Sequence, residues 1–174
     1  MGCFASKSVE VIPGKQLEDY LTEKEVFIVK DTWMALEEDL TDTGYILFKR
    51  LFNRHADLKA LFGRIMVTTP TGDIIVDDNK LRNHGTAVMH GLGAAVESLE
   101  DSMFLTDILI SIGEKHFEYQ VKPEMMAYFW PAIRDTWREK LKYEFTEEAE
   151  SAWKHVFEYM ASKIVEGIIR AGKG

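Results

Sequence analysis

Cysteine is nearly absent from the sequence, since Cys3 is the single cysteine among 174 residues. One thiol cannot form a disulfide within the chain, and it excludes zinc and iron–sulfur sites that need several thiolates. A reducing intracellular compartment is therefore the expected setting.

Basic residues and long hydrophobic runs are also scarce. The chain has 21 Lys and Arg against 29 Asp and Glu, which gives a formal net charge of −8. This balance offers no electrostatic match to a nucleic-acid backbone or to an anionic bilayer, so no nucleic-acid partner is expected. No segment approaches the length of a membrane-spanning helix, and the first twenty residues lack the apolar core of a secretory signal.

The length of the chain predicts one domain with a sizeable core. Residues 1–20 contain Pro13 and Gly14 without hydrophobic periodicity, and we expect them to form a flexible tail. Residues 21–174 form the expected folded domain. Its first helix is predicted to follow Thr22, which forms a capping box with Glu25.

The remaining pattern is helical. A second helix is expected to start at Thr41 or Asp42, and the last helix is expected to be capped by Thr146 and ended by Gly172. Residues 74–76 have strand character, but they have no partner segment of comparable strength, so a sheet is not expected. The sequence thus predicts an all-α fold of six to eight helices.

Prolines mark the start of the helix that precedes the last one. Pro123 suits a first helical position, where its missing N–H costs no hydrogen bond. Pro131, eight residues further on, is expected to remove a backbone hydrogen bond and to bend the helix axis.

Two histidines lie in the apolar stripes of successive predicted helices. His84 shares a face with Leu81 and Val88, and His116 lies one turn after Ile112, 32 residues from His84. A single histidine on an apolar face is most often an ordinary core residue. Two of them on successive helices favour a flat iron macrocycle held between the helices.

The other three histidines provide a contrast. His90 and His155 lie off the apolar stripes of their helices, and His55 lies near a helix end. We therefore interpret them as solvated or capping groups.

Residues 21–171 resemble the globins in several short motifs that occur in the family's order and spacing. The motif VKDTW resembles the tryptophan-bearing first helix, and LFNRHADLKALF resembles the run that ends at the phenylalanine stacked on the haem. The motif NHG, with Val88, resembles the distal helix, and LISIGEKH resembles the proximal helix. Ala56 is a departure, because many globins have proline at that position.

The resemblance implies a globin fold that sandwiches haem b, iron protoporphyrin IX, with His116 as the proximal iron ligand and His84 as the distal histidine. Phe62 would stack on the porphyrin, and Arg64 would pair with a propionate. The other residues that the resemblance places in the pocket are Phe48, Val88, Val121, Met126 and Phe129. For the apolar residues the alternative is ordinary core packing, and for Arg64 it is a solvated surface charge.

The spacing of the two histidines, together with Phe48, resembles neuroglobin and globin X more than the globins of muscle or blood. This implies that His84 binds the iron when no gas is present, and that it must leave before O₂, NO or CO binds. A role in redox signalling or gas sensing follows more readily than bulk storage. The alternatives are nitrite reduction or nitric oxide dioxygenation, which would need an external reductase, and an iron-free helical module.

The first six residues, MGCFAS, fit the pattern for myristoylation of Gly2. One acyl chain anchors a protein only weakly, and Lys7 and Lys15 are too sparse to add an electrostatic signal. A palmitoyl group on Cys3 would supply the second anchor. Dual acylation is also implied by the resemblance to globin X, so the expected location is the inner face of the plasma membrane. The alternative is a chance match in the tail.

Overall fold

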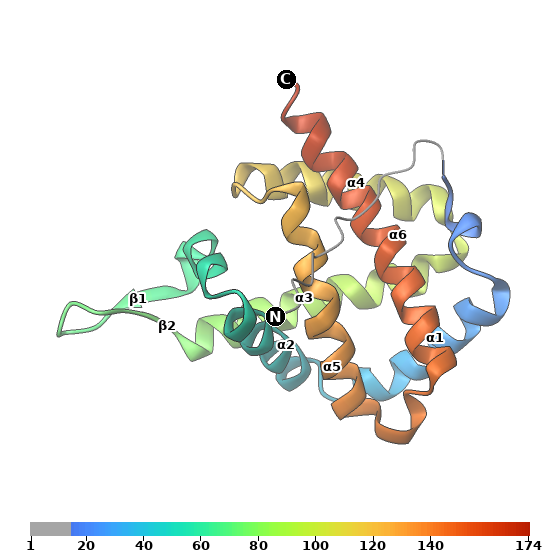
Figure 1. The fold of residues 1–174 in the computed structure, drawn as a ribbon, viewed down its shortest axis with the longest axis horizontal. Helices are drawn as coiled ribbons and strands as arrows, with labels where there is room; N and C mark the ends of the chain where they lie inside the picture. Colours follow the sequence, from blue (N-terminus) through green and yellow to red (C-terminus); the bar gives the residue numbers. More distant parts are fainter. Residues whose placement is uncertain (1–14) are drawn as a thin grey trace, which may run out of the picture.

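The computed structural model describes residues 15–174, and this part of the chain contains six α-helices, short 3-10 segments and one β-hairpin (Figure 1). The all-α prediction is confirmed. Helix α2 packs on α3, and α4 packs along α6. The α-helices are α1 (Glu23–Glu37), α2 (Leu40–Arg54), α3 (Asp78–Glu97), α4 (Ser102–Glu118), α5 (Phe129–Leu141) and α6 (Glu147–Ala171).

Side-chain caps set most of the helix ends. The Thr22 hydroxyl accepts a hydrogen bond from Glu25 N, and the Glu25 carboxylate accepts one from Thr22 N, as the capping box predicts. Thr146 caps α6 and Gly172 ends it, also as predicted. Helix α2 starts earlier than predicted, because the carboxylate of Asp39 caps it and places Asp42 in its first turn.

Packing also begins before Thr22, where the folded domain was expected to start. A 3-10 turn at Leu17–Asp19 buries Leu17, whose side chain is 3% exposed. Tyr20 then packs edge-to-face on Tyr159 of α6, with ring centroids 5.5 Å apart. Apolar periodicity could not reveal so short an element.

The expectation that residues 74–76 form no sheet is wrong. Strand β2 (Ile74–Val76) pairs antiparallel with β1 (Met66–Thr68), with Met66 opposite Val76. The chain reverses through hydrogen bonds of 2.8 Å from Thr69 N to Asp73 O and 2.9 Å from Gly72 N to Thr69 O. Gly72 has a φ of 90°, which favours glycine. Both strands are three residues long, but β1 contains Met66 and Thr68 where β2 is entirely β-branched and apolar, so β1 has the weaker strand signal.

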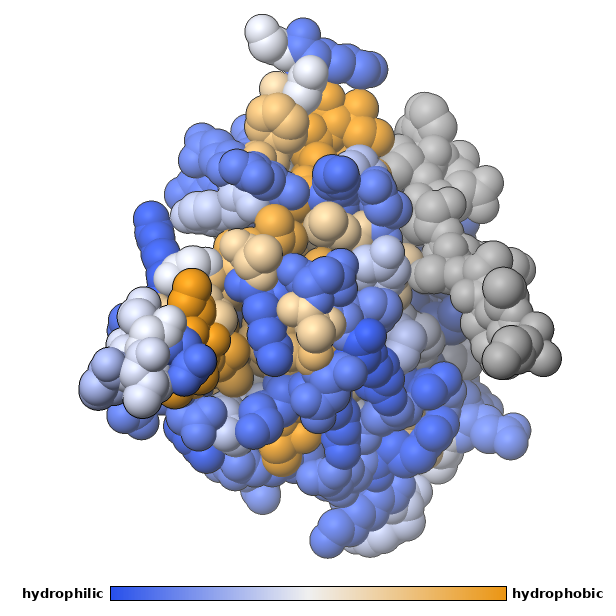
Figure 2. Space-filling view, turned by 60° about the vertical axis from the view of Figure 1, so that its left-hand side comes forward, coloured by the Kyte–Doolittle hydropathy of each residue, from blue (hydrophilic) through white to orange (hydrophobic). Residues whose placement is uncertain are grey.

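The hairpin projects from the helical body (Figure 1), and Ile74 and Ile75 on β2 are exposed. In the space-filling view an apolar patch lies on this projection, within a mostly hydrophilic surface (Figure 2). Of the helices in residues 15–174, none is both long and apolar enough to cross a bilayer.

Pro131 does not lie eight residues into a helix, as was expected. A 3-10 helix covers Pro123–Tyr128, and α5 begins afresh at Phe129. Pro131 is thus the third residue of α5, where a backbone N–H has no partner within the helix, and no hydrogen bond is lost. Pro123 begins the 3-10 helix, as its predicted first-turn position requires.

Indole rings from three helices form the centre of the core. Trp153 of α6 lies 6.2 Å from Trp33 of α1 and 5.3 Å from Trp137 of α5, measured between ring centroids. The Trp153 N–H donates to the hydroxyl of Thr32 over 2.9 Å. Because all three rings are almost fully buried, they join α1, α5 and α6 into one unit.

Helices α2 and α3 cross with their backbones in contact at two glycines. A Cβ added to Gly44 would lie 2.5 Å from the carbonyl carbon and oxygen of Gly85, and a Cβ on Gly85 would lie 2.7 Å from the carbonyl carbon of Gly44. Any side chain at either position would force the helices apart. The crossing therefore fixes α3, and with it His84, against the helix that carries Phe48.

We predict that Gly44→Ala lowers the free energy of unfolding by about 1–3 kcal/mol, the usual cost of overpacking a core. Gly91→Ala is the matched control, because a Cβ there has no neighbour within 4 Å. Replacing this exposed helical glycine should raise the free energy of unfolding by up to about 1 kcal/mol. Urea unfolding measures both changes, and equal effects of the two substitutions would contradict the tight crossing.

Candidate functional site

His84 lies among aromatic rings contributed by α2 and by the segment after it. Its ring centroid is 4.9 Å from that of Phe48 and 5.4 Å from that of Phe62, both in edge-to-face arrangements. Phe129 at the start of α5 contacts Phe48 from another side, with a centroid distance of 5.9 Å. The structure therefore brings together four of the residues expected in one pocket.

The ring nitrogens of His84 make no hydrogen bond with any residue in 15–174, although the ring is half-buried. Burial lowers the pKa of His84, and the charge of His116 lowers it further. A neutral imidazole with an available nitrogen lone pair is the form that binds a metal ion.

His116 is oriented by its own helix. Its Nδ1 lies 2.8 Å from the carbonyl oxygen of Ile112, one turn earlier in α4. Because a carbonyl only accepts, Nδ1 carries the proton and Nε2 keeps its lone pair. This is the usual outer-shell arrangement of a histidine that ligates a metal. A carbonyl four residues back is available to any helical histidine, so the sequence alone did not single out Ile112.

The remaining expected pocket residues are more scattered. Met126 is buried in a small cluster with α6 residues, and Val121 packs at the edge of that cluster. Val88, one turn after His84, is 37% exposed. Arg64 is exposed, and its guanidinium lies 5.8 Å from the ring centroid of Tyr119, the residue at the carboxyl end of α4. Tyr119 was not recognised from the sequence, because its partner comes from the loop before the hairpin.

The other three histidines have different surroundings. The Nδ1 of His155 lies 2.6 Å from the Glu25 carboxylate, so the ring has a hydrogen-bond partner in the protein. His55 stacks on Tyr128 with ring centroids 4.0 Å apart. His90 is exposed, as expected. None of the three contacts the aromatic group around His84.

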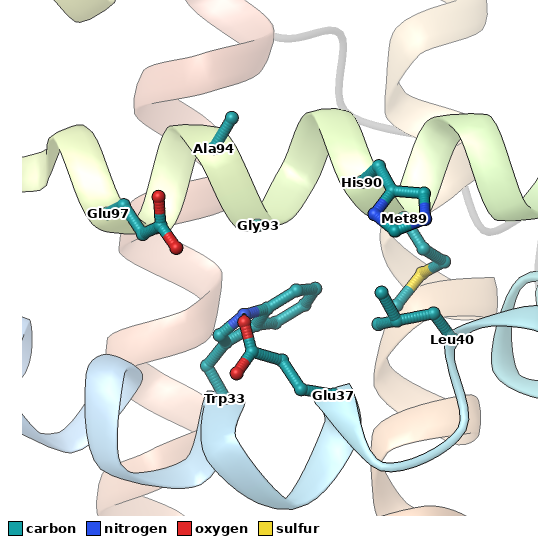
Figure 3. Close-up of a pocket in the computed structure, with 8 residues that line it drawn as sticks. All are labelled: Trp33, Glu37, Leu40, Met89, His90, Gly93, Ala94 and Glu97. Atoms are coloured by element: carbon teal, nitrogen blue, oxygen red, sulfur yellow. The ribbon is translucent and has the colours of Figure 1, made fainter.

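A surface depression of about 230 Å³ lies between α1 and α3 (Figure 3). Among the residues that line it, the Trp33 N–H donates to the Glu37 carboxylate over 2.6 Å, and His90 of α3 is another lining residue. Neither His84 nor His116 lines this depression, so it is separate from the candidate site.

Comparison with known proteins identifies the family. The family model for globins matches residues 46–164, which include both histidines and the surrounding aromatic residues. The chain belongs to the globin family. Membership implies haem binding, and the residues present fit that group: the Nδ1 of His116 is held by the Ile112 carbonyl, which leaves Nε2 for a metal, and the His84 imidazole lies among aromatic side chains.

The globin has curated relatives of moderate similarity. Neuroglobin from Tetraodon nigroviridis is 28% identical over 153 residues, covering 88% of this chain and 96% of the relative. Cytoglobin-2 from Danio rerio is 26% identical over 145 residues, covering 83% of this chain and 80% of the relative. A solved structure of a hexacoordinated haem protein from an anhydrobiotic tardigrade has a TM-score of 0.75 and 21% identity, covering 86% of this chain and 96% of that one, which shows the shared fold.

The lowered pKa of His84 predicts a pH dependence of the globin's stability without haem. In the unfolded chain His84 has the ordinary pKa of 6.5, whereas in the folded chain its pKa is lower. This contribution to the free energy of unfolding is therefore complete above about pH 6.5 and falls as the pH decreases toward the lower, folded pKa.

Urea unfolding of the apoprotein between pH 7.5 and 5.5 measures this effect. His84→Leu should flatten the profile, and His90→Gln, at an exposed histidine, should leave it unchanged. A profile that stays equally steep in the His84 variant would show that other groups cause it.

Proposed function

We propose that this globin binds haem b between His84 and His116, with His116 Nε2 as the proximal iron ligand and His84 as the distal one. The observation that carries the proposal is geometric: the Nδ1 of His116 is held by the Ile112 carbonyl, and the His84 ring lies against Phe48 and Phe62. Haem b supplies an iron that binds O₂, NO or CO reversibly. Every other contribution comes from side chains of the protein.

The aromatic residues around His84 exclude water and limit the positions of its ring. Phe48 is 1% exposed and touches His84, Phe62 and Phe129, so it connects the walls of the proposed pocket. We assign Phe62 to stacking on the porphyrin and Phe129 to lining it, at a position beyond the helix that carries His116. Val88, Val121 and Met126 complete the apolar lining, and Arg64 is placed to pair with a propionate.

In this proposal His84 occupies the iron whenever no gas is bound. The apparent affinity for a gas is then reduced by the fraction of molecules in which His84 is bound. Similarity to neuroglobins, and a fold shared with a hexacoordinated haem protein, support this arrangement. A globin closed in this way suits gas sensing or redox signalling better than bulk oxygen storage.

Variants of the two histidines should behave differently. The reduced, gas-free wild type should show the sharp, split visible bands of low-spin iron. His84→Leu should keep one haem per chain but show a broad high-spin spectrum and faster CO binding. His116→Ala should lose haem or change colour, because the proximal ligand is gone.

Haem titration of apoprotein and absorption spectroscopy measure these outcomes, with His90→Gln as the control. An unchanged pigment content and spectrum in His116→Ala would overturn the proposed site. A high-spin spectrum of the reduced wild type would overturn only the proposed ligation by His84, and not the haem site as a whole.

We further propose that the amino terminus anchors the globin to the inner face of the plasma membrane through acyl groups on Gly2 and Cys3. Both residues lie outside the described part of the chain, and the proposal is supported by the MGCFAS pattern. Two acyl chains together give stable membrane binding, whereas one myristoyl chain binds only marginally. An anchored globin is placed to exchange electrons or gas signals with membrane partners.

Gly2→Ala should abolish incorporation of a myristate analogue and shift the protein from the membrane to the supernatant fraction of eukaryotic cells. Cys3→Ser should keep myristoylation but weaken membrane binding. Ala5→Ser preserves the pattern and is the matched control. Equal membrane association of Gly2→Ala and wild type would rule out the anchor.

A further inference from the structure

Helices α4 and α6 touch through their backbones at a second pair of glycines. A Cβ added to Gly113 would lie 2.0 Å from the carbonyl oxygen of Ile164, and one added to Gly167 would lie 2.1 Å from the carbonyl oxygen of Ile110. Each added Cβ would also lie 2.9 Å from the Cα of the opposite glycine. Neighbours this close are backbone atoms and cannot rotate away.

The contact is reciprocal. Each glycine follows, by three residues, the isoleucine whose carbonyl meets the glycine of the other helix. The two Cα groups therefore face two carbonyl oxygens across the crossing, an arrangement that suits a pair of weak Cα–H···O contacts. A contact of this kind fixes both the separation of the helices and their relative position along the axis.

The backbone held at this crossing is also the backbone that orients His116. Ile112, whose carbonyl accepts the hydrogen bond from His116 Nδ1, is the neighbour of Gly113 in the chain. His116 itself lies one turn after Gly113 on the same helix. A displacement of α4 at Gly113 would carry the Ile112 carbonyl and the imidazole with it.

We propose that Gly113 and Gly167 are positioning residues for His116: their crossing sets the height and tilt at which His116 Nε2 is presented to the iron. This inference rests on the proposed haem site. An alanine at either position requires the helices to separate by about 1.4 Å to restore an ordinary contact of 3.4 Å. That shift is large beside a metal–imidazole bond of about 2 Å.

The test compares Gly113→Ala and Gly167→Ala in the haem-loaded protein. Both should weaken the low-spin bands of the reduced protein and speed haem loss by about 10- to 100-fold, the range for changes beyond the directly ligating atoms. Gly91→Ala, with open space around its Cβ, should change neither the low-spin bands nor the rate of haem loss. Leu105→Ala removes a buried side chain from α4 without widening the crossing, so it controls for lost stability.

A second background separates positioning from general damage. In His116→Gly, free imidazole replaces the side chain and has no bond to α4. Adding Gly113→Ala to His116→Gly should therefore leave the imidazole-restored spectrum unchanged, although the same substitution alters the spectrum when His116 is present. Such a difference between the two backgrounds would support the positioning role.

Each contrary result is decisive. Equal spectral changes in both backgrounds, an effect of Leu105→Ala as large as that of Gly113→Ala, or a wild-type spectrum in both alanine variants would overturn the inference. Failure of both variants to fold would also count against the inference, because the inference requires α4 to shift as a unit. A wild-type spectrum of His116→Gly without imidazole would instead contradict the proposed haem site itself.

Discussion

The hydrogen bond from His116 Nδ1 to the Ile112 carbonyl is the interaction on which the proposed chemistry depends. It fixes the tautomer, and so leaves Nε2 as the nitrogen with a lone pair. The acceptor is the helix's own backbone, so the orientation of the ring is tied to the position of α4. The packing of α4 against α6 therefore helps to set the position of His116, the proposed iron ligand.

The sequence predicted those parts of the molecule that follow from helical periodicity. His84 and His116 could be found because each lies in register with an apolar stripe. The caps Thr22 and Thr146 could be found because capping depends on residues close by in the sequence. The all-α fold follows from the same periodicity. Local patterns of this kind do not depend on contacts with distant segments of the chain.

What could not be predicted depends on contacts between distant segments. The β1–β2 hairpin depends on pairing with β1, whose sequence has a weaker strand signal than β2. Pro131 costs no helical hydrogen bond because a 3-10 helix replaces the first six residues of the expected helix. The pairing of Gly113 with Gly167 joins positions 54 residues apart in the sequence. Without the fold, each glycine is only an unfavourable residue inside a helix.

The two histidines differ in how firmly the protein holds them, and this difference agrees with the roles proposed for them. His116 is bound to the Ile112 carbonyl, so turning its ring away would break a hydrogen bond. The His84 ring lies edge-to-face against Phe48 and Phe62 and makes no hydrogen bond within the described residues, so its rotation breaks no hydrogen bond. In the proposed haem site, which must open for a gas, we therefore expect His84 to be the ligand that leaves.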